Sequence, residues 1–379
     1  MSTVVSPTPS PSITVRELSG DADRAAWDAF AGACPEGDVL QSWEWAAVKK
    51  ADMAPLRIAA FRDGAIAGGA AILRYSLPLV GPYYYAPRGP LLADWADEAV
   101  LVELLSAIRE RARRDGAMFL KIDPAVPVER EDVAKLLAKH GCRPPVGTDA
   151  QGFGGTQPRC VMVLDVGGRT EQELLAGFKP QTRRNIKLST EKHGVEVVED
   201  VTRGNLVAFD ALMKVTGERD GFKPYNLAYF QSIWDNLGNA GMAKLFLTRY
   251  EGEYLSGAIC FLIGDKAWYV FGASSNENRN VMPNYAMQWA MIRWALRSGC
   301  STYDFRGVSP RRRVEGESAE EVEKEDHLQG LNRFKEGFGS RYVEYIGELH
   351  LVYKPAAYWL FTNGKSAVQG IRRKLLSKP

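Results

Sequence analysis

Alternating apolar and polar positions predict a β-hairpin twice along the chain. The first hairpin spans residues 56–73 and turns at Asp63-Gly64, a dipeptide typical of tight turns because glycine accepts positive φ without steric cost. The second spans residues 243–263 and turns at Glu251-Gly252. At the same distance beyond its turn glycine each hairpin has a Gly-Ala pair, Gly69-Ala70 and Gly257-Ala258. These matches indicate an internal repeat.

The elements that follow each hairpin also repeat. A further strand comes first, then a helix and another strand: residues 97–115 and 118–122 in the first copy, 285–298 and 302–305 in the second. We expect the helices to end at Gly116 and Gly299, which suit the left-handed position after a helix, and Asn284 to cap the second helix. The pattern predicts an α/β (α+β) unit duplicated in tandem, with copies about 185 residues apart in a chain of 379.

Four segments lie outside this repeat. Residues 1–12 are rich in Ser, Thr and Pro and are expected to form a flexible tail, while the Gly- and Pro-rich residues 141–158 are expected to connect two domains. Residues 309–327 carry three arginines followed by acidic residues and predict a solvated, mobile loop. Residues 358–376 predict a basic amphipathic helix, either an ordinary surface helix or one that contacts an acidic membrane face.

The amino-acid composition mainly excludes classes of protein. Hydrophobic residues make up 45% and charged residues 25%, which is typical of a soluble globular chain, and the length suggests two domains. Lys+Arg 48 against Asp+Glu 46 gives a formal charge of +2, which excludes an overall basic nucleic-acid coat but not a local basic patch. No apolar run approaches the roughly 18 residues of a membrane span, and no signal-peptide pattern is present at the start.

The five cysteines are scattered and odd in number, which predicts a reduced, cytoplasmic protein with no disulfide framework and no Cys-based metal site. The four histidines stand far apart, and G-x-S-x-G, H-E-x-x-H, Walker A and Rossmann glycine motifs do not occur. Hydrolases with a Ser or Cys nucleophile, metal hydrolases and P-loop kinases are therefore disfavoured. The remaining pattern suits transfer chemistry in which binding and orientation do most of the work.

Two basic segments are candidates for phosphate contact. Residues 41–50 predict a short helix capped by Ser42, which is either an ordinary amphipathic helix or one that holds Lys49 against a phosphate. Arg183 and Arg184 belong to a basic cluster that opens a second predicted helix. That helix is either a plain surface helix or a phosphate contact.

Three further segments are candidates for binding or proton transfer. Tyr85 lies in an aromatic strand that ends before Arg88, and the strand either belongs to the core or lines a groove for a sugar or a peptide. Asp123 ends the last strand of the first copy, either in a simple turn or facing a cleft. Arg219 is expected on a turn.

Lys335 is the candidate with the most unusual surroundings. It lies between Phe334 and Phe338 in a segment framed by glycines. Removal from water there would strengthen the electrostatic interactions of a lysine charge. The segment follows the 309–327 loop, which itself comes after the strand that carries Asp304. None of these candidate signals is specific alone.

Taken in order, six segments carry a family resemblance. They are Gln41-Ser42-x-x-Trp45-x-x-x-Lys49, Ala86-Pro87-Arg88-Gly89-Pro90, Thr182-Arg183-Arg184-Asn185-Ile186, Gly272-Ala273-Ser274-Ser275-Asn276, Tyr303-Asp304-Phe305-Arg306-Gly307 and Phe334-Lys335-x-x-Phe338-Gly339. Together they resemble the Fem family, the non-ribosomal peptidyl transferases that build the interpeptide bridges of peptidoglycan. The matching segments extend over residues 41–348, nearly the whole chain.

The resemblance implies two GNAT-like acyltransferase domains in tandem, which agrees with the internal repeat. In this fold the end of the chain usually returns to the first domain. We therefore expect domain 1, with precursor binding, over residues 13–158 plus 346–379 and domain 2 over 159–345. Some members carry a long coiled-coil arm, but this sequence has no heptad run and resembles the compact, arm-less type.

The implied activity is transfer of Gly, Ala or Ser from aminoacyl-tRNA to the side-chain amine of the third stem-peptide residue, lysine or ornithine. The acceptor is lipid II or UDP-MurNAc-pentapeptide. Attack of an amine on an aminoacyl ester needs no added cofactor, and no metal is expected. The resemblance further implies a cytoplasmic monomer, with a peripheral contact to the inner membrane face as an option. The 309–327 loop would border the acceptor channel.

Site roles also follow from the resemblance. Lys49 would contact the diphosphate of the precursor, and Lys335 would assist the transfer step by stabilising negative charge. Asp123 or Asp304 would take the proton, unless the terminal groups of the tRNA do so. The other substrate-binding candidates are Arg219 as a second diphosphate contact, Tyr285, Phe334, Tyr85 and Arg88, and the tRNA or phosphate contacts are Arg183 and Arg184. We expect the cleft in or beside domain 1, near Lys49 and Asp123.

Two other functions stay open. An acyl-CoA-dependent N-acyltransferase could use the same fold, but the Q/R-x-x-G-x-G/A turn that would hold the CoA pyrophosphate on backbone N–H groups is missing. A non-catalytic protein that binds the cell-wall precursor is the second alternative. Charged tRNA, acyl-CoA and precursor alone, each checked for product or binding, would separate the three.

Overall fold

The computed structural model describes residues 12–49, 54–77, 81–145, 156–199, 201–310 and 329–363. The first half of the chain contains β1 (Ile13–Glu17), α1 (Gly20–Ala33), η1 (Val39–Gln41), α2 (Trp43–Val48), β2 (Leu56–Arg62), β3 (Ala65–Leu77), β4 (Gly81–Ala86), β5 (Leu91–Leu92), α3 (Glu98–Asp115), β6 (Phe119–Ile122) and α4 (Glu131–Lys139).

The second half begins with β7 (Cys160–Asp165). It continues with α5 (Glu171–Gly177), α6 (Pro180–Lys187), η2 (Leu188–Lys192), β8 (Glu196–Val198), η3 (Arg203–Asn205), α7 (Leu206–Asp220), α8 (Leu227–Ile233), η4 (Trp234–Gly238), β9 (Ala243–Tyr250), β10 (Glu253–Ile263), β11 (Lys266–Ser274), η5 (Arg279–Val281), α9 (Pro283–Arg297), β12 (Thr302–Gly307), β13 (Arg341–Glu344) and β14 (Leu349–Val352). Residues 329–336 and 355–363 are also helical.

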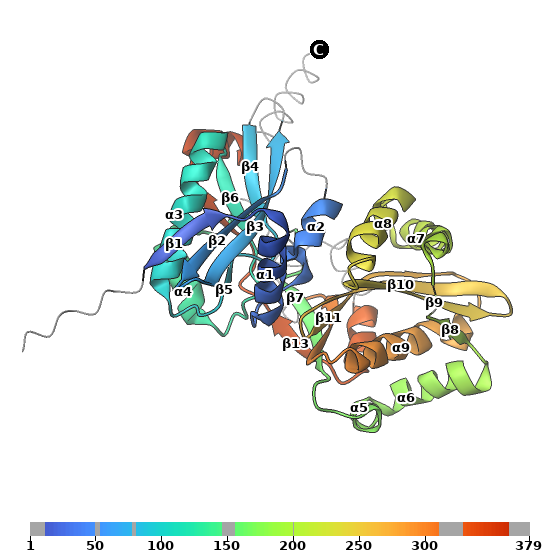
Figure 1. Cartoon of the computed structure of the whole chain (residues 1–379). Helices are drawn as coiled ribbons and strands as arrows, with labels where there is room; N and C mark the ends of the chain where they lie inside the picture. The colour runs from blue at the N-terminus through green and yellow to red at the C-terminus, as the bar shows by residue number, and fades with distance from the viewer. Residues whose placement is uncertain are drawn as a thin grey trace, which may run out of the picture.

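The strands form two seven-stranded sheets, one in each half of the molecule (Figure 1). The first has the order β1-β2-β3-β4-β6-β14, with β5 paired to β3, and the second has the order β13-β7-β12-β11-β10-β9-β8. The elements β1-α1-α2-β2-β3-β4-α3-β6 recur in the same order as β8-α7-α8-β9-β10-β11-α9-β12. In both copies the last two strands are a parallel pair bridged by the long helix. The predicted duplication is therefore confirmed.

The two hairpin turns have the same backbone geometry. Asp63 and Gly64 have φ values of 51° and 83°, and Glu251 and Gly252 have φ values of 50° and 87°. Two successive left-handed residues match the right-handed twist of the flanking strands, and glycine adopts this region without strain. The dipeptides marked in the sequence are thus the turns of both hairpins.

The long helices end as predicted, but one begins elsewhere. Gly116 is the left-handed cap of α3, and Gly299 follows α9 with a φ of 77°. The prediction that Asn284 caps α9 is wrong, because the helix begins at Pro283 and its N-cap is Met282. Proline suits the first helical position, where its missing N–H would have no intrahelical partner, so Asn284 lies inside the first turn.

The paired Gly-Ala sites have a common packing role. A Cβ at Gly69 would lie 2.6 Å from the ring of Trp27 in α1, and a Cβ at Gly257 would lie 2.8 Å from the ring of Phe209 in α7. Both rings are fully buried. In each copy the glycine lets the first long helix press an aromatic ring directly onto the sheet.

The two halves share apolar packing. Trp45 of α2 contacts Phe261 of β10 edge-to-face, with ring centroids 5.7 Å apart, inside one core cluster that draws residues from both halves. Lys266 of the second half donates to the carbonyl oxygens of Gly32 and Cys34 at 3.2 and 2.8 Å.

The chain returns to the first sheet after β13, because β14 pairs with β6 whereas β13 pairs with β7. This pairing supports our proposal of domain limits at 13–158 plus 346–379 and 159–345.

Several predicted features lie partly or wholly outside the described residues. These are residues 1–11 of the tail, 146–155 of the expected connection, 311–327 of the expected mobile loop, and the part of the expected helix after residue 363. In the part of the chain that is described, no helix is both long and apolar enough to cross a bilayer. All five cysteines are buried and unpaired.

Candidate active site

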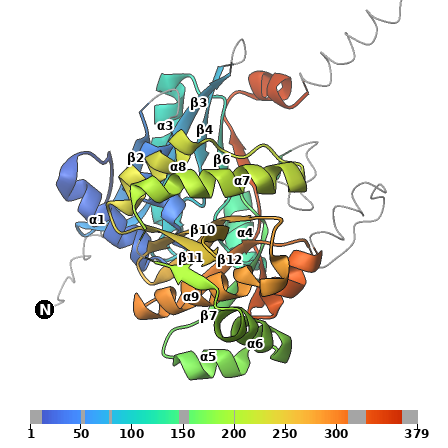
Figure 2. The same cartoon turned by 90° about the vertical axis from the view of Figure 1, so that its right-hand side faces the viewer.

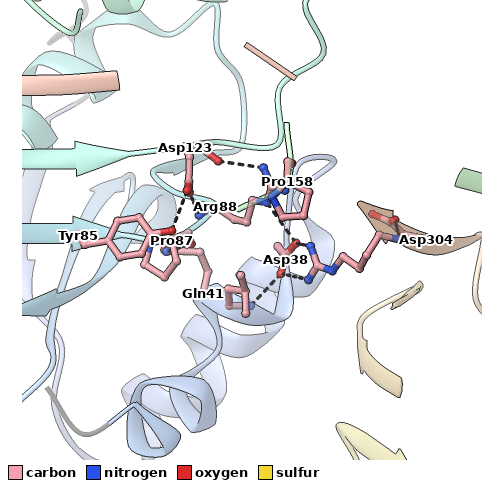
Figure 3. Close-up of polar contacts among 10 residues, drawn as sticks. Asp38, Gln41, Tyr85, Pro87, Arg88, Asp123, Pro158 and Asp304 are labelled. Atoms are coloured by element: carbon pink, nitrogen blue, oxygen red, sulfur yellow. Dashed lines mark hydrogen bonds and ion pairs between the residues drawn. The ribbon is translucent and has the colours of Figure 1, made fainter. Parts of the chain in front are cut away.

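A buried carboxylate lies at the end of the parallel strand pair in the first half. Asp123 follows β6, is 2% exposed, and accepts the backbone N–H of Arg88 on Oδ1 at 2.6 Å. Its Oδ2 accepts the hydroxyl of Tyr85 at 2.7 Å (Figure 3). Burial raises the pKa of Asp123 to about 6, although the Arg88 charge and these hydrogen bonds oppose the shift.

The second half contains a similar arrangement. Asp304 of β12 is buried and accepts the backbone N–H of Arg306 on Oδ1 at 2.5 Å. Burial raises the pKa of Asp304, with the Arg306 charge acting against the shift. Arg88 and Arg306 both have a φ of 57°. This left-handed conformation is rare outside glycine, and in both halves the arginine N–H binds the carboxylate.

Asp38 connects the two arrangements. It is 2% exposed, and both of its oxygens accept from the Arg306 guanidinium at 2.9 and 3.1 Å. The Nε of Arg88 lies 4.0 Å from Asp38 Oδ2. The backbone N–H of Leu40 in η1 also donates to Asp38. One carboxylate from the first half thus faces the charges of two arginines, one from each half of the molecule (Figure 3).

Lys335 binds the backbone just after Asp304. It is 3% exposed, and its Nζ donates to the carbonyl oxygens of Gly307 at 2.6 Å and Arg306 at 3.3 Å. Burial lowers the pKa of Lys335 to about 7, while the negative charge of Asp304 acts to raise it. Burial therefore brings the pKa of this lysine close to neutral pH.

A cavity of about 160 Å³ lies at the start of α9. Phe334, which precedes Lys335 in the sequence, is one of its lining residues. Tyr285 and Phe334 meet edge-to-face at 4.9 Å on its wall. Its other lining residues are Ser274, Ser275, Arg279, Met282, Pro283 and Asn284. The mixture of hydroxyl, aromatic and cationic groups suits a small polar acyl group carried on an anion.

Lys49 lies among aromatic rings from both halves. Its Nζ is 5.3 Å from the ring centroid of Trp45, 4.9 Å from Tyr225 and 4.7 Å from Tyr229. Ser42 caps the short helix as predicted, accepting from the N–H of Trp45. No ion pair to Lys49 occurs within the described ranges. The aromatic faces attract the ammonium without neutralising it, so its charge is available to a bound anion.

The prediction that Arg219 lies on a turn between elements is wrong, because Arg219 belongs to the last turn of helix α7. It forms an ion pair with Asp220 at 2.8 Å and donates to the carbonyl oxygen of Ser274 at 3.0 Å. Ser274 also lines the cavity, so Arg219 contacts one of the lining residues.

The two arginines of α6 differ in their surroundings. Arg183 donates to the carbonyl oxygens of Ala176 and Phe178, so it binds the C-terminal end of α5. Arg184 is exposed. Of the two proposed tRNA contacts, Arg184 is the one whose charge faces solvent.

The predicted residues therefore gather in three groups. Tyr85, Arg88, Asp123, Asp304 and Lys335 belong to one buried polar cluster. Tyr285 and Phe334 line the cavity, and Arg219 binds the backbone of Ser274, another lining residue. Lys49 lies in its aromatic cage. This cavity lies in the second half, and the expected cleft near Lys49 and Asp123 stays a prediction. Asp123 is enclosed by its own partners.

Two residues of the cluster were not selected from the sequence, Asp38 and Arg306. They are 268 residues apart and carry no local signal of pairing, although Arg306 lies within one of the quoted family segments. Gln41, which opens another segment, is fully buried. Its side-chain amide bonds both backbone groups of Ala71 and the carbonyl oxygen of Pro87. That contact fixes the backbone just before Arg88.

The repeated topology, with a parallel strand pair bridged by a long helix in each half, defines a tandem of two GNAT-like acyltransferase domains. A tandem GNAT protein from the clavulanic acid biosynthesis pathway matches 89% of this chain and 98% of its own, with a TM-score of 0.51 at 13% identity, and so shares the fold. The crystal structure of FemX matches 92% of this chain and 100% of its own, with a TM-score of 0.79 at 28% identity.

The sequence comparisons give the family. The FemAB family model matches residues 23–253 and 240–365. The lipid II:glycine glycyltransferases of Staphylococcus haemolyticus (strain JCSC1435) and Staphylococcus aureus (strain MRSA252) are 30% identical to this chain, over 93% of its length and 96% of theirs. The chain belongs to the FemAB family and is a tRNA-dependent aminoacyltransferase of peptidoglycan bridge synthesis. The resemblance found in the sequence is confirmed.

Proposed function

We propose that this enzyme transfers an amino acid from aminoacyl-tRNA to the side-chain amine of the third stem-peptide residue of a peptidoglycan precursor. The observation that carries the proposal is the match to lipid II:glycine glycyltransferases over 93% of the chain, which includes both halves. Glycine and lipid II are therefore the donor amino acid and acceptor to test first. Alanine or serine, and the soluble UDP-MurNAc-pentapeptide, are the alternatives.

The chemistry is attack of a neutral amine on an aminoacyl ester through a tetrahedral oxyanion. We place the aminoacyl end in the cavity beside Tyr285 and Phe334, and Phe334 is the neighbour of Lys335 in the sequence. A buried ammonium aimed at developing negative charge stabilises the transition state more than the ground state. The two carbonyl contacts of Lys335 hold its Nζ in place in the absence of substrate.

Asp304 is the stronger of the two candidates for proton acceptor. Both oxygens of Asp123 already accept from groups of the protein, whereas Asp304 lies beside the lysine proposed to act in transfer. A carboxylate whose pKa is raised by burial is a better base than an exposed one and is matched more closely to neutral pH. The terminal groups of the tRNA are the remaining alternative.

Lys49 is proposed to bind the diphosphate of the precursor. Phosphate needs a cation that is not already neutralised, and the aromatic cage of Trp45, Tyr225 and Tyr229 supplies one. Arg219 could add a second contact only by leaving or sharing its ion pair with Asp220. Lys49 therefore dominates this part of the proposal.

The test is transfer of labelled amino acid from tRNA charged with glycine, alanine or serine. Each donor is offered lipid II and the soluble pentapeptide precursor, with lysine or ornithine in the third position, and the product is identified by mass spectrometry. Acetyl-CoA replaces the tRNA in a parallel reaction, which tests the acyl-CoA alternative. Product from acetyl-CoA but not from any charged tRNA would overturn the proposal, as would precursor binding without product.

A further inference from the structure

Two acidic side chains meet where α1 contacts α2. Asp28 belongs to α1 and Glu44 to the first turn of α2, and Glu44 is 4% exposed. The two carboxyl groups lie within hydrogen-bonding reach of each other. Arg24 donates its Nε–H to Oε1 of Glu44 at 2.7 Å, but Oε2 is buried and has no hydrogen-bond partner among the described residues. A buried acceptor without a donor lowers stability, so a donor is expected at this place.

A proton on Asp28 supplies that donor. Burial raises the pKa of Asp28 to about 7, and the neighbouring charge of Glu44 acts in the same direction, while the hydrogen bond from the backbone N–H of Trp43 opposes the shift. Near neutral pH one proton is therefore held between two carboxyl groups, and its titration belongs to the pair. The O–H of the protonated Asp28 can donate to Oε2 of Glu44, the oxygen that otherwise has no partner.

Two arginines face this acid pair. Arg24 lies on α1, and Arg57 lies on β2 with its guanidinium 3.8 Å from the ring centroid of Trp43. Burial lowers the pKa of Arg57 to about 10, although the charges of Asp28 and Glu44 oppose this shift, so Arg57 is positively charged at neutral pH. The two cations favour one ionised carboxyl group, and the contact between the acids disfavours a second.

Asp28 also borders a space that solvent can enter. It lines a cavity of about 660 Å³ between α1 and the second domain. The other charged residue on the described part of the cavity wall is Asp265, which forms an ion pair with Lys266 at 3.2 Å. Because the acid forms part of this wall, its proton can exchange with solvent while the protein stays folded.

The same pair fixes the start of α2. Oδ1 of Asp28 accepts the backbone N–H of Trp43, the first residue of that helix, at 2.8 Å. This N–H is one of the groups at a helix start that have no partner within the helix. Asp28 and Glu44 lie on different helices, and two ionised carboxyl groups in contact repel each other. Loss of the shared proton therefore pushes α2 away from α1.

The other end of α2 leads directly to Lys49, the proposed contact for the precursor diphosphate. The helix has six residues, Trp43–Val48, and the backbone N–H of Lys49 donates to the carbonyl oxygen of Trp45. A helix of this length spans about 9 Å. A displacement at its start is therefore carried to Lys49.

The aromatic cage of Lys49 depends on the position of α2, because its walls come from both domains. Trp45 belongs to α2, whereas Tyr229 belongs to α8 and Tyr225 to the segment just before that helix. The two helices contact each other and lie next to each other in Figure 1, and Figure 2 shows α8 in front of the strands of the first domain. A shift of α2 relative to α8 therefore opens or closes the cage.

We propose that Asp28 and Glu44 share one proton and are positioning residues for Lys49. The protonated pair holds α2 against α1 in the orientation that closes the aromatic cage, and loss of the proton loosens this orientation and weakens anion binding. The inference rests on the proposed role of Lys49 in binding the diphosphate and adds proton-dependent control of its affinity. By linkage, precursor affinity should fall as the pH rises through about 7, and precursor binding should take up a proton there.

The first experiment measures binding of UDP-MurNAc-pentapeptide to the full chain by calorimetry, without aminoacyl-tRNA, between about pH 5.5 and about pH 8.5. The diphosphate diester of this probe keeps its charge over the range, so a change in affinity comes from the protein. We expect Kd of the wild type to rise by about 10-fold, an ordinary coupling between two sites. Proton uptake on binding, measured in buffers of different ionisation enthalpy, should be largest near neutral pH. Constant affinity without proton uptake would overturn the proposal.

Asp28→Asn replaces the titrating acid by an amide of the same shape. Its oxygen can still accept from the N–H of Trp43 and its NH₂ can donate to Glu44, so the variant should keep the low-pH affinity of the wild type at high pH. Asp28→Leu offers neither group and should bind the probe about 10-fold more weakly even at low pH. Asp21→Asn changes an exposed acid of the same helix and is the matched control, with the pH dependence of the wild type.

Two results with these variants would count against the proposal. A wild-type pH dependence in Asp28→Asn would assign the titration to another group. Unchanged affinity in Asp28→Leu would show that the contact between α1 and α2 does not position Lys49.

A readout without ligand distinguishes this proposal from the proposed function. Because the pKa of Asp28 is raised, the folded protein binds more protons than the unfolded chain between about pH 4 and about pH 7. The free energy of unfolding of the wild type, relative to Asp28→Asn, should therefore fall as the pH rises across this window. Parallel profiles would show that the pair holds no proton and would overturn the proposal even if the probe binds. Diverging profiles without probe binding at any pH would instead refute the diphosphate role of Lys49, and the positioning role with it.

Discussion

Asp123 and Asp304 are buried carboxylates of the last strand of the parallel pair in their domains, Asp123 just after β6 and Asp304 within β12, and their surroundings differ. Each accepts the backbone N–H of a left-handed arginine, at 2.6 and 2.5 Å. The second partner of Asp123 is the phenol of Tyr85, whereas Asp304 lies near the charged groups of both Arg306 and Lys335. Both oxygens of Asp123 are therefore occupied within the protein, and Asp304 is the carboxylate that lies near a lysine of lowered pKa.

The difference suggests how a duplicated fold divides its work. We propose that the buried carboxylate of the first domain has a structural role and that Lys49 on its surface binds the precursor, while Asp304 and Lys335 of the second domain act in transfer. Asp38 binds the two arrangements together through Arg306 and lies 4.0 Å from Arg88. The following predictions test this division.

The largest expected effect is on stability. Asp38→Asn removes the negative charge that faces two buried guanidinium groups, and breaking a buried ion pair in this way typically costs about 3–5 kcal/mol. Urea unfolding of the variant measures the loss. Asp235→Asn is the control, because it breaks the exposed Arg203–Asp235 pair and should cost about 0–1 kcal/mol. Equal losses in the two variants would show that Asp38 is not a link between the domains.

Lys335→Met is expected to fold and to bind precursor but to lose kcat by about 100- to 1000-fold, the usual value of one preorganised donor, about 3–4 kcal/mol. Saturating aminoacyl-tRNA and precursor in a single-turnover assay isolate this step. Lys135→Met on α4, whose lysine is highly exposed, is the matched control and should retain full activity. Wild-type kcat in Lys335→Met would make Lys335 a packing residue and remove the contrast between the two domains.

Lys49→Met is expected to act on binding instead. Loss of the uncompensated ammonium should raise KM for the precursor by about 10-fold or more, roughly 1.4 kcal/mol, and should spare kcat at saturation. Lys49→Arg should recover part of the affinity because it restores the charge. A fall in kcat with unchanged KM would show that Lys49 acts in the transfer step and not in precursor binding.

Tyr85→Phe distinguishes a structural role of Tyr85, as a hydrogen-bond donor to Asp123, from a role in substrate binding. The variant leaves Asp123 with one donor fewer, which should lower the free energy of unfolding by about 1–2 kcal/mol. A structural role predicts that KM and kcat measured below the unfolding transition stay near wild type. A rise in KM at unchanged stability would instead support Tyr85 as a substrate-binding residue.

The last prediction concerns a change of slope with pH. The pKa of Lys335 falls from 10.5 in the unfolded chain to about 7 in the folded protein, so between these values the unfolded state binds more protons. The free energy of unfolding should therefore rise with pH across this window in the wild type. Lys335→Met lacks this titration, and its stability relative to the wild type should decline from about pH 7 to about pH 10. Parallel pH profiles would show that the amine is not buried in solution.

Much of this architecture could be predicted from local sequence. The turn dipeptides Asp63-Gly64 and Glu251-Gly252, the helix-ending glycines and the order of elements revealed the duplication, because turns and amphipathic periodicity are properties of short segments. Six weak segments in a fixed order were enough for the family, and they already contained Lys49, Asp304 and Lys335. The N-cap of α9 was missed because Pro283 gave the stronger helix start.

Tertiary structure alone decided how these residues meet. No short-range pattern pairs Asp38 with Arg306, or brings β14 back to β6, because such contacts depend on how two sheets pack. Left-handed φ values at Arg88 and Arg306 are also invisible in sequence, since arginine has no preference for that region and is held there by the carboxylates that its N–H groups bind. Burial shifts the pKa values of Asp123 and Lys335 toward neutrality, and burial exists only once both domains have closed around them.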